Sequence, residues 1–287
     1  MKRQVELRRR LRTLRTLREA VGAMKSLSAH HFRAARAVVE PARAYRRGVE
    51  RVLAWSHAAL PSGENGAGLL VIGGEYGLCG AFHSQLVAEA VKTRRELGAG
   101  PTLCVGRRGA TLLARSGVAI DAALAAPTGV RGITDLLLRV GEDVFARYTG
   151  DRLSSFHIVS SRFVGVGHAN PVVTRLLPVA FERAAPERTI RYVARALLAT
   201  AAIREFLYVS LYQLVLDALA SEHGARLVAT QAAERWLDER TEVVRLELAT
   251  ARREASTQEM IEIAAASRLE QRKRAAARSV LLAPGAI

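Results

Sequence analysis

Between Val5 and about Trp55, apolar residues recur at intervals of three and four. Only two glycines, Gly22 and Gly48, and one proline, Pro41, interrupt this pattern, which predicts a single long helix. Its apolar stripe comprises Leu7, Leu11, Leu14, Leu17, Val21, Met24, Phe32, Ala35, Val39, Ala42, Val49 and Val52. At about 1.5 Å per residue, some 50 residues make a helix of roughly 75 Å, longer than a small domain is wide. A helix of this length needs a partner to cover its stripe.

The C-terminal segment, from residue 187 to Pro284, shows the same helical pattern, and Gly224 is its only glycine. About 90 helical residues would extend over roughly 135 Å. A second, heptad-like stripe comprises Leu211, Val215, Ala218, Ala225, Ala229, Ala232, Trp236, Val243 and Leu246, interrupted by Glu222 and Glu239. This segment is therefore predicted to be a second long helix with an apolar seam.

Strand and helix patterns alternate between these two segments, after the linker-like stretch LPSGENGAG at 60–68. The predicted strands are 68–74, 101–109, 154–164 and 171–180, and the predicted helices are 81–97 and 132–148. This alternation is typical of a compact, Rossmann-like α/β domain. The last two strands have no helix between them, which predicts a mixed sheet.

We therefore divide the chain into an N-terminal coiled-coil helix (1–60), a central α/β domain (61–186) and a C-terminal coiled-coil helix (187–287). Two long helices at opposite ends of one chain most simply bury their seams against each other. The domain between them lets the chain reverse direction. The predicted fold class is α/β plus long α, with an antiparallel coiled coil flanking the Rossmann-like domain.

The composition is that of a folded soluble protein, since 287 residues with 49% hydrophobic content can form a core. No apolar stretch reaches the roughly 18 residues of a membrane-spanning helix, and the N-terminus lacks the apolar segment of a secretory signal. We expect a cytoplasmic protein that can still attach to a membrane complex. Cys79 and Cys104 are interpreted as small buried hydrophobic residues. His30 and His31 point to different sides of a helix, which argues against a joint metal site.

Charge is concentrated at the N-terminal end of the chain. The net charge is +16, and residues 1–55 hold 15 Lys and Arg against 4 Asp and Glu, which gives +11. A basic helical scaffold that binds nucleic acid is one interpretation of this excess. Against it, the basic residues occupy nearly every side of the helix, and Phe32, Tyr45 and Trp55 are too few for a base-stacking platform.

The stretch GGEYGLCGAF, residues 73–82, carries four glycines directly after an apolar run. A phosphate-binding P-loop needs a lysine followed by Ser or Thr, and a dinucleotide fingerprint needs GxGxxG spacing; neither is present. The stretch favours a tight strand-to-helix turn that packs Leu78 and Cys79 inward. Anion binding at the N-terminus of the following helix is the remaining alternative. No cofactor and no metal site are expected.

A nucleophile site is not indicated elsewhere either. Ser160 and Ser161 lie near His157 but lack an elbow motif, and the carboxylates are spread along helices as solvated faces. The sequence therefore predicts no catalytic residues.

Three stretches together resemble the gamma subunit of F-type ATP synthases. The first is LRTLREAVGAMKSLSAHHFRAAR, residues 14–36, and the second is GLCG, residues 77–80. The third comprises ASEHGARLVATQAA, residues 220–233, and ARREASTQEMIEIAAAS, residues 251–267. Departures from the family pattern are Glu75 and Tyr76 in place of Asp-Arg, Trp236 and Leu237 in place of Asn-Ala, Arg253 in place of Gln, and Glu254 in place of Ala. The chain looks like a diverged bacterial member.

The resemblance implies a rotating central stalk that couples ion flow to ATP synthesis or hydrolysis, in a subunit without catalytic residues of its own. The implied partners are three alpha and three beta subunits, the epsilon subunit and the c ring, with no nucleic acid, at the cytoplasmic side of a bacterial membrane. The residues that match the family's rotor contacts with beta subunits are Met24, Lys25, Arg226, Arg252, Thr257, Gln258 and Glu259. Two alternatives stay open: Met24 belongs to the coiled-coil seam, and the arginines merely solvate outer faces.

Overall fold

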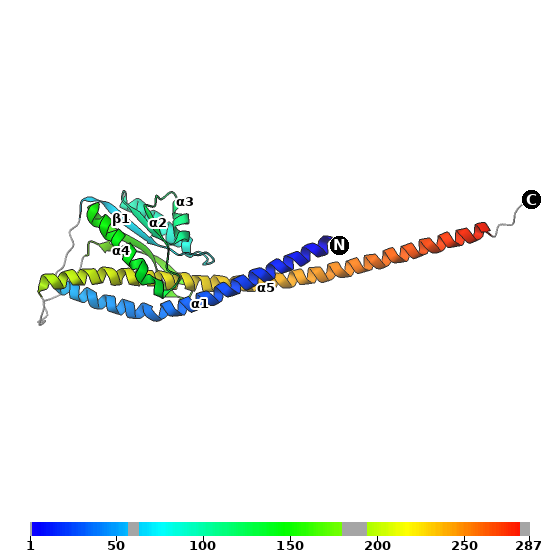
Figure 1. Ribbon diagram of the computed structural model, residues 1–287, viewed down its shortest axis with the longest axis horizontal. Coiled ribbons are helices and arrows are strands. Elements are labelled where there is room, and N and C mark those ends of the chain that lie inside the picture. Colours follow the sequence, from blue (N-terminus) through cyan, green and yellow to red (C-terminus); the bar gives the residue numbers. More distant parts are fainter. Residues whose placement is uncertain (1, 57–62, 180–193, 282–287) are drawn as a thin grey trace, which may run out of the picture. The chain divides into compact units, whose positions relative to one another are not determined.

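The computed structural model describes residues 2–56, 63–179 and 194–281 (Figure 1). Its elements are α1 Lys2–Ser56, β1 Asn65–Ile72, α2 Phe82–Leu97, β2 Thr102–Val105, α3 Arg107–Arg115, β3 Ala122–Leu124, the 3-10 turn η1 Val130–Gly132, α4 Ile133–Gly150, β4 Leu153–Gly165, β5 His168–Leu177 and α5 Arg195–Leu281. The chain divides into two compact units. Unit 1 is Met1–Gly22 with Ala233–Ile287, and unit 2 is Ala23–Ala232. The domain boundaries predicted at 60/61 and 186/187 lie outside the described residues.

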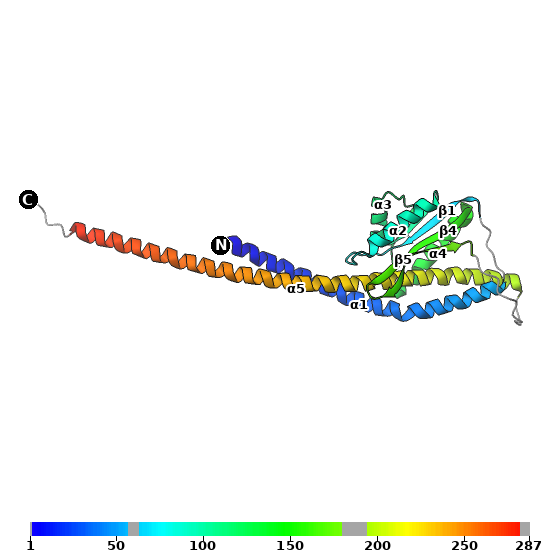
Figure 2. The ribbon, with the colours of Figure 1, turned by 180° about the vertical axis from the view of Figure 1, so that it is seen from behind.

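Unit 2 contains a five-stranded sheet in the order β3-β2-β1-β4-β5, of which β1, β4 and β5 are labelled in Figure 2. The first four strands are parallel, and Leu70 at the centre of β1 pairs with Leu103 of β2 and Ile158 of β4. β5 runs antiparallel to β4. This confirms the predicted mixed sheet. The strand order is that of a doubly wound, Rossmann-like domain with an antiparallel edge strand.

Both faces of this sheet are covered, so β1 is buried along Ala67–Ile72 and reads as a continuous apolar run. Leu69 and Val71 face a cluster shared with α2 and α3. Leu70 and Ile72 face the larger cluster, to which α4, α1 and α5 contribute. Successive side chains point to opposite faces of a strand, which is why one strand serves two cores.

Unit 1 consists of the N-terminal part of α1 and the C-terminal part of α5, packed side by side. Its leucine seam comprises Leu7, Leu11, Leu14, Leu237, Val244, Leu248 and Ala251. Arg3 pairs with Glu254, and Arg18 pairs with Asp238, so numbers rise along α1 as they fall along α5. This confirms the predicted antiparallel coiled coil. The seam positions on α5 are spaced by seven, four and three, as in the heptad repeat of a coiled coil.

The stripe predicted for the second helix is wrong in unit 1. Trp236, Val243 and Leu246 are exposed, whereas Leu237 and Val244, one position further along, are buried. In this part of α5, apolar residues lie on two faces of the helix, and only one of these two faces packs against α1. Leu17, assigned to the first helix's stripe, is also exposed.

Two short elements of unit 2 were missed. The run 101–109 was predicted as one strand, but β2 ends at Val105 and α3 begins at Arg107. Gly106 between them has a φ of 94°, which reverses the chain direction at no steric cost. β3 has only three residues, none of them β-branched, so no strand pattern was visible. Among the described residues, no helix is both long and apolar enough to cross a bilayer.

Candidate functional site

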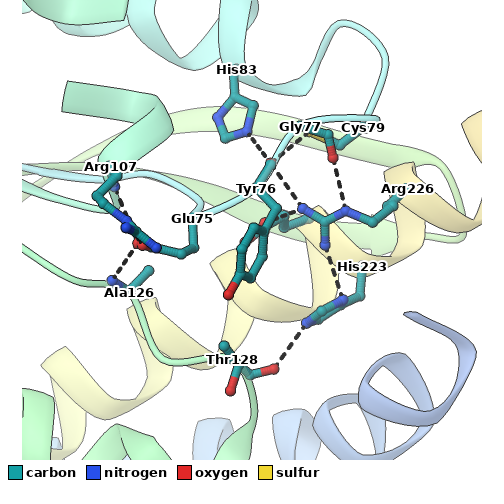
Figure 3. Close-up of polar contacts among 11 residues, drawn as sticks. Glu75, Tyr76, Gly77, Cys79, His83, Arg107, Ala126, Thr128, His223 and Arg226 are labelled. Carbon is teal, nitrogen blue, oxygen red and sulfur yellow. Dashed lines mark hydrogen bonds and ion pairs between the residues drawn. The ribbon is translucent and has the colours of Figure 1, made fainter. Parts of the chain in front are cut away.

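The glycine-rich loop, residues 73–80, follows β1 and is held by Arg226 of α5 (Figure 3). Arg226 Nε–H donates to the Gly77 carbonyl oxygen over 3.0 Å, and an Nη2–H donates to the Tyr76 carbonyl oxygen over 2.9 Å. His83, at the start of α2, contacts the same Tyr76 oxygen through Nε2 at 3.0 Å. The Arg226 side chain is only 2% exposed. One buried guanidinium therefore fixes two successive carbonyl groups of the loop.

Glu222 and His223, the neighbours of Arg226 on α5, complete its hydrogen bonds; we call these three residues with the loop the Arg226 cluster. Arg226 Nη2 forms an ion pair with the buried Glu222 carboxylate. Arg226 Nη1 donates to His223 Nδ1 over 3.2 Å. Because arginine can only donate, Nδ1 carries no hydrogen, and His223 Nε2–H donates to the Thr128 carbonyl oxygen over 3.3 Å.

His223 is neutral in this arrangement. Burial lowers the pKa of His223 to about 3, and the positive charge of Arg226 acts in the same direction. His31 of α1 stacks on the His223 ring with centroids 5.0 Å apart. Burial likewise lowers the pKa of His31. The cluster thus contains one buried ion pair, Arg226 with Glu222, whose remaining guanidinium donors meet the loop carbonyl oxygens and His223. The imidazoles beside it are uncharged.

Two glycines allow α5 to approach the ends of the strands. A Cβ at Gly74 would lie 2.4–2.6 Å from the carboxyl atoms of Glu222. A Cβ at Gly106, whose φ is 94°, would lie 2.6 Å from the Gly74 carbonyl oxygen. Both contacts are far shorter than van der Waals distances. These glycines are therefore needed for packing around Glu222.

The carboxyl ends of the parallel strands are where doubly wound sheets bind their ligands. In this chain the cavity there is lined by Ile72, Gly73 and Val105 from the sheet side and by Glu222 and its neighbours from α5. It measures about 10 Å³, whereas ligand pockets typically measure roughly 300–1,000 Å³. Side chains of α5 thus fill the place that a nucleotide takes in other folds of this kind.

Glu75 follows the two glycines and organises the neighbouring loops. Its carboxylate accepts hydrogen bonds from the backbone N–H of Arg107 over 3.2 Å and of Ala126 over 3.1 Å, and it forms an ion pair with the Arg107 side chain. Burial by itself raises the pKa of Glu75, but these hydrogen bonds outweigh it and lower the pKa. The carboxylate therefore caps the N-terminus of α3 as an anion. This gives a structural role to one of the departures from the family pattern.

The turn prediction is right for Cys79 and wrong for Leu78. Cys79 is buried, and burial raises the pKa of its thiol to about 11; burial raises the pKa of the Cys104 thiol to about 12. Both thiols are therefore protonated and unreactive at neutral pH. Leu78 is 55% exposed with a φ of 59°. The loop turns its carbonyl groups toward Arg226, which leaves the Leu78 side chain outside.

The seven residues singled out as partner contacts fall in both units. In unit 2, Met24 and Lys25 are half-buried on α1, and Met24 lies outside the buried leucine seam. Arg226, as described, is directed into the protein. Its role in holding the loop was missed, because nothing in the sequence shows that this side chain reaches a carbonyl 150 positions earlier.

In unit 1, Arg252, Thr257, Gln258 and Glu259 are all exposed on α5. Thr257 donates to the Arg253 carbonyl oxygen over 3.0 Å, and Gln258 donates to the Glu262 carboxylate over 2.9 Å. These bonds lie within the helix and leave the outer surface open. Within the described ranges, no group of three or more His, Cys, Asp or Glu side chains could hold a metal ion.

The end of α5 presents a further surface that sequence reasoning missed; we call residues 256–274 the bare segment. Every residue in this segment is exposed, and among the described residues the last ion pair between α5 and α1, Arg3–Glu254, precedes it. Its large apolar side chains are Met260, Ile261, Ile263 and Leu269, each more than half exposed. Apolar residues on all sides of an uncovered helix indicate a surface that other chains bury.

Comparisons with known proteins agree along nearly the whole chain. Residues 3–268 match a family model described as ATP synthase. The chain is 28% identical over 274 residues to the ATP synthase gamma chain of Pelotomaculum thermopropionicum, covering 90% of this chain and 95% of that protein. It is 29% identical over 282 residues to the ATP synthase gamma chain of Acidithiobacillus ferrooxidans, covering 91% and 96%.

Solved structures show the same fold. A chain in the Euglena gracilis mitochondrial ATP synthase, in a structure of its F1 part and c ring, superposes with a TM-score of 0.65 at 14% identity, covering 95% of this chain and 96% of that chain. A chain in the central stalk and c ring structure of the Tetrahymena thermophila mitochondrial ATP synthase gives a TM-score of 0.58 at 18% identity, covering 75% and 99%.

Proposed function

This chain belongs to the ATP synthase family and is a gamma chain, the central-stalk subunit of an F-type ATP synthase, and on that premise we propose how its helices transmit rotation. As a gamma chain it couples ion flow through the membrane c ring to ATP synthesis or hydrolysis at the beta subunits. Its partners are the three alpha and three beta subunits, the epsilon subunit and the c ring.

The bare segment is the observation that carries the proposed mechanism. A single helix in water is only marginally stable and gains most of its stability from packing of an apolar face. Here Ile261 and Ile263 are exposed, and no other helix of the described part of the chain covers them. The ring of alpha and beta subunits supplies the missing cover, and the segment turns inside it.

Rotation can drive the beta subunits only if the shaft presents different surfaces to each of them. A partner that binds all conformational states of a subunit equally well does not change the populations of those states. The different sides of unit 1 do present different surfaces. One side of α5 is covered by α1 along the leucine seam, while Trp236 and Leu246 are exposed. Each beta subunit therefore meets a different mixture of apolar and charged side chains as the shaft turns.

We propose that Met24, Lys25, Arg252, Thr257, Gln258 and Glu259 contact the beta subunits, supported by the exposed or half-exposed positions of their side chains. Arg226 was placed in the same group by resemblance. Its burial and its bonds to the loop support a positioning role within unit 2 instead.

The chain is a subunit of the ATP synthase complex, and we propose that it contributes no catalytic residue. The small cavity at the strand ends and the protonated thiols support this proposal. As a peripheral subunit it belongs to a membrane-associated complex. We place it at the cytoplasmic side of a bacterial membrane, since the curated relatives named above come from bacteria. Nucleic-acid binding is less favoured, because arginines of α1 such as Arg18 and Arg43 pair with carboxylates.

Charge reversal tests the contact residues. Arg252→Glu and Lys25→Glu place a negative charge where the shaft faces the acidic loops that the family resemblance assigns to the beta subunits. We expect the ion gradient formed per ATP hydrolysed in reconstituted vesicles to fall by roughly half or more, because a like charge across an interface costs several kcal/mol. The complex should still assemble, as judged by co-purification of its subunits.

Arg115→Glu on α3 is the matched control, since it makes the same charge change at an exposed arginine away from both long helices. It should leave the gradient per ATP unchanged. An unchanged gradient in both test variants, or an equal fall in the control, would contradict the proposed contacts.

A further inference from the structure

Unit 2 contains a second, larger cavity that the central-stalk role does not use. It measures about 540 Å³ and lies between α1, α5 and the pair of strands β4 and β5. Four arginines line it, three from α1 and one from β4: Arg43, Arg46, Arg47 and Arg162. Among the described residues, the carboxylates in its lining are Glu50 and Asp217. The cavity is therefore both large enough for a small ligand and positively charged.

The two carboxylates are already matched by two of the arginines. Arg43 Nη2 lies 2.6 Å from the buried Asp217 carboxylate. Arg46 Nη2 lies 3.0 Å from the Glu50 carboxylate. Arg47 and Arg162 make no ion pair with any described residue of the chain. Both side chains are exposed, so two positive charges lie at the open side of the cavity without a counter-charge from the described residues.

A buried hydroxyl group in the same wall also lacks a partner. Ser160 of β4 is fully buried, and its Oγ forms no hydrogen bond with any described residue. The Nε–H of Arg43 is a second buried donor in this cavity that has no hydrogen-bond partner among the described residues. Buried donors without acceptors cost free energy, and they are rare in folded proteins. An acceptor-rich ligand would satisfy both.

We propose that this cavity binds a small phosphate-bearing anion, held between Arg47 of α1 and Arg162 of β4 with Ser160 Oγ as a further donor. Arginine suits this ligand because its planar fork of N–H groups matches two oxygens of one phosphate. The Arg43–Asp217 pair then positions Arg43 instead of competing for the ligand. The proposal concerns this cavity alone, and it stands whether or not the shaft contacts described above are correct.

Phosphate fits the lining better than a carboxylate ligand does. A carboxylate group offers two oxygens and one negative charge, whereas phosphate and pyrophosphate offer more oxygens and more charge. Two unpaired guanidinium groups and two unsatisfied donors match the latter. Val172 and Leu214 contribute an apolar part of the lining beside these donors.

Such a ligand would join two elements that are far apart in the sequence, the end of α1 and β4. Anything that binds only the folded state raises its stability in proportion to the logarithm of ligand concentration over Kd. The bound anion would therefore stiffen the attachment of α1 to the sheet. The proposal predicts a rise in Tm of the full-length chain with added pyrophosphate.

The test uses the purified full-length chain and isothermal titration with sodium phosphate and sodium pyrophosphate at constant ionic strength. Arg47→Gln with Arg162→Gln removes both unpaired charges. Arg36→Gln with Arg115→Gln changes the net charge equally, at exposed arginines outside the cavity. We expect the cavity variant to bind pyrophosphate at least about tenfold more weakly than the wild type, because hydrogen bonds from charged donors are stronger than those between neutral groups. The control variant should bind as the wild type does.

Ser160→Ala separates ligand binding from folding. Because the Ser160 hydroxyl has no partner in the free chain, its removal should leave Tm without ligand unchanged or higher. Affinity for pyrophosphate should fall about threefold, within the range for one neutral hydrogen bond. A lower Tm without any change in affinity would show that the hydroxyl serves the fold and not a ligand.

Vesicles of phosphatidylcholine with phosphatidic acid identify the source of the phosphate. If the wild type binds these vesicles but not the free ions, and the cavity variant does not bind the vesicles, the ligand is a lipid headgroup. This outcome supports the same phosphate chemistry. The proposal is overturned if the wild type binds neither the ions nor the vesicles. It is also overturned if the cavity and control variants weaken binding equally, since binding would then follow net charge alone.

Discussion

The Arg226 cluster of unit 2 and the leucine seam of unit 1 use the same helix, α5, in opposite ways. In unit 2, α5 is buried on almost every side from Leu214 to Arg226, and it carries an ion pair whose partners are all within the protein. In unit 1, α5 meets only α1, through aliphatic side chains, and its ion pairs with α1 lie on the surface.

The difference shows what each part of the helix requires. A buried guanidinium is tolerated only where enough acceptors surround it, and the loop carbonyls, Glu222 and His223 supply them. A helix covered on one side can use a simple apolar stripe and leave its other faces for partners. The polar groups of the Arg226 cluster are therefore satisfied within unit 2, whereas the outer faces of unit 1 are left for partners.

The largest expected effect comes from Arg226→Met, which removes the buried ion pair of the Arg226 cluster in unit 2. Methionine keeps apolar volume but leaves Glu222 as an unpaired buried charge. It also removes the Arg226 donor from the Gly77 carbonyl oxygen and leaves the Tyr76 carbonyl oxygen with His83 alone. We expect a loss of about 3–5 kcal/mol in the free energy of opening, the range for breaking a buried ion pair on one side. Amide hydrogen exchange of β1 measures it.

Arg235→Met is the control for this change, since Arg235 is an exposed arginine on the same helix. It should stay within about 0.5 kcal/mol of the wild type. Equal protection of β1 in the Arg226 and Arg235 variants would mean that the cluster does not stabilise unit 2.

A smaller effect is expected from Leu14→Ala in the seam. Leu14 is buried against α5, and truncating a buried leucine costs about 2–3 kcal/mol where neighbours can relax. Amide exchange should speed up in α1 within unit 1 and stay unchanged in β1. Leu17→Ala, one turn along and exposed, should change neither. Matching effects of the two substitutions would show that the seam does not follow the observed register.

The smallest effect is a pH dependence confined to unit 2. The pKa of His223 falls from 6.5 to about 3 on folding, so below pH 6.5 the unfolded chain takes up a proton that the folded chain refuses. Stability is therefore present above this range and lost as pH falls from about 6.5 toward 3, by up to about 2 kcal/mol between pH 7 and pH 5. Exchange of β1 amides at the two pH values measures this loss.

His223→Gln should flatten that dependence, because an amide can accept from Arg226 and donate to Thr128 without titrating. His168→Gln, at an exposed histidine, should leave it as in the wild type. A pH dependence of equal size in both variants would assign the acid effect to groups other than His223.

The sequence predicts the two long helices and the principal strands well, because their periodicities extend over many residues. It fails where an element is short, as for α3 and β3, or where apolar residues lie on two faces. Trp236 and Leu246 look like seam residues for this reason. They are exposed because Leu237 and Val244 face α1 instead, a register that the periodicity of one helix does not determine.

The candidate site was predictable to a lesser degree. Resemblance selects Arg252 and Thr257 to Glu259, and the structure places these side chains on the open surface of α5. It also selects Arg226, but the internal role of that residue depends on tertiary contacts with a loop far away in the sequence. The cavity at Arg47 and Arg162 joins two elements that no local pattern connects.

The bare segment has a consequence for how the cell must handle this subunit before it is assembled. A lone helix that unwinds readily, with isoleucine and methionine side chains on its surface, is a ready substrate for proteases and a nucleus for aggregation. Copies made in excess of the ring would be degraded. The amount of this subunit that persists then depends on synthesis in step with the alpha and beta subunits, as well as on its own folding.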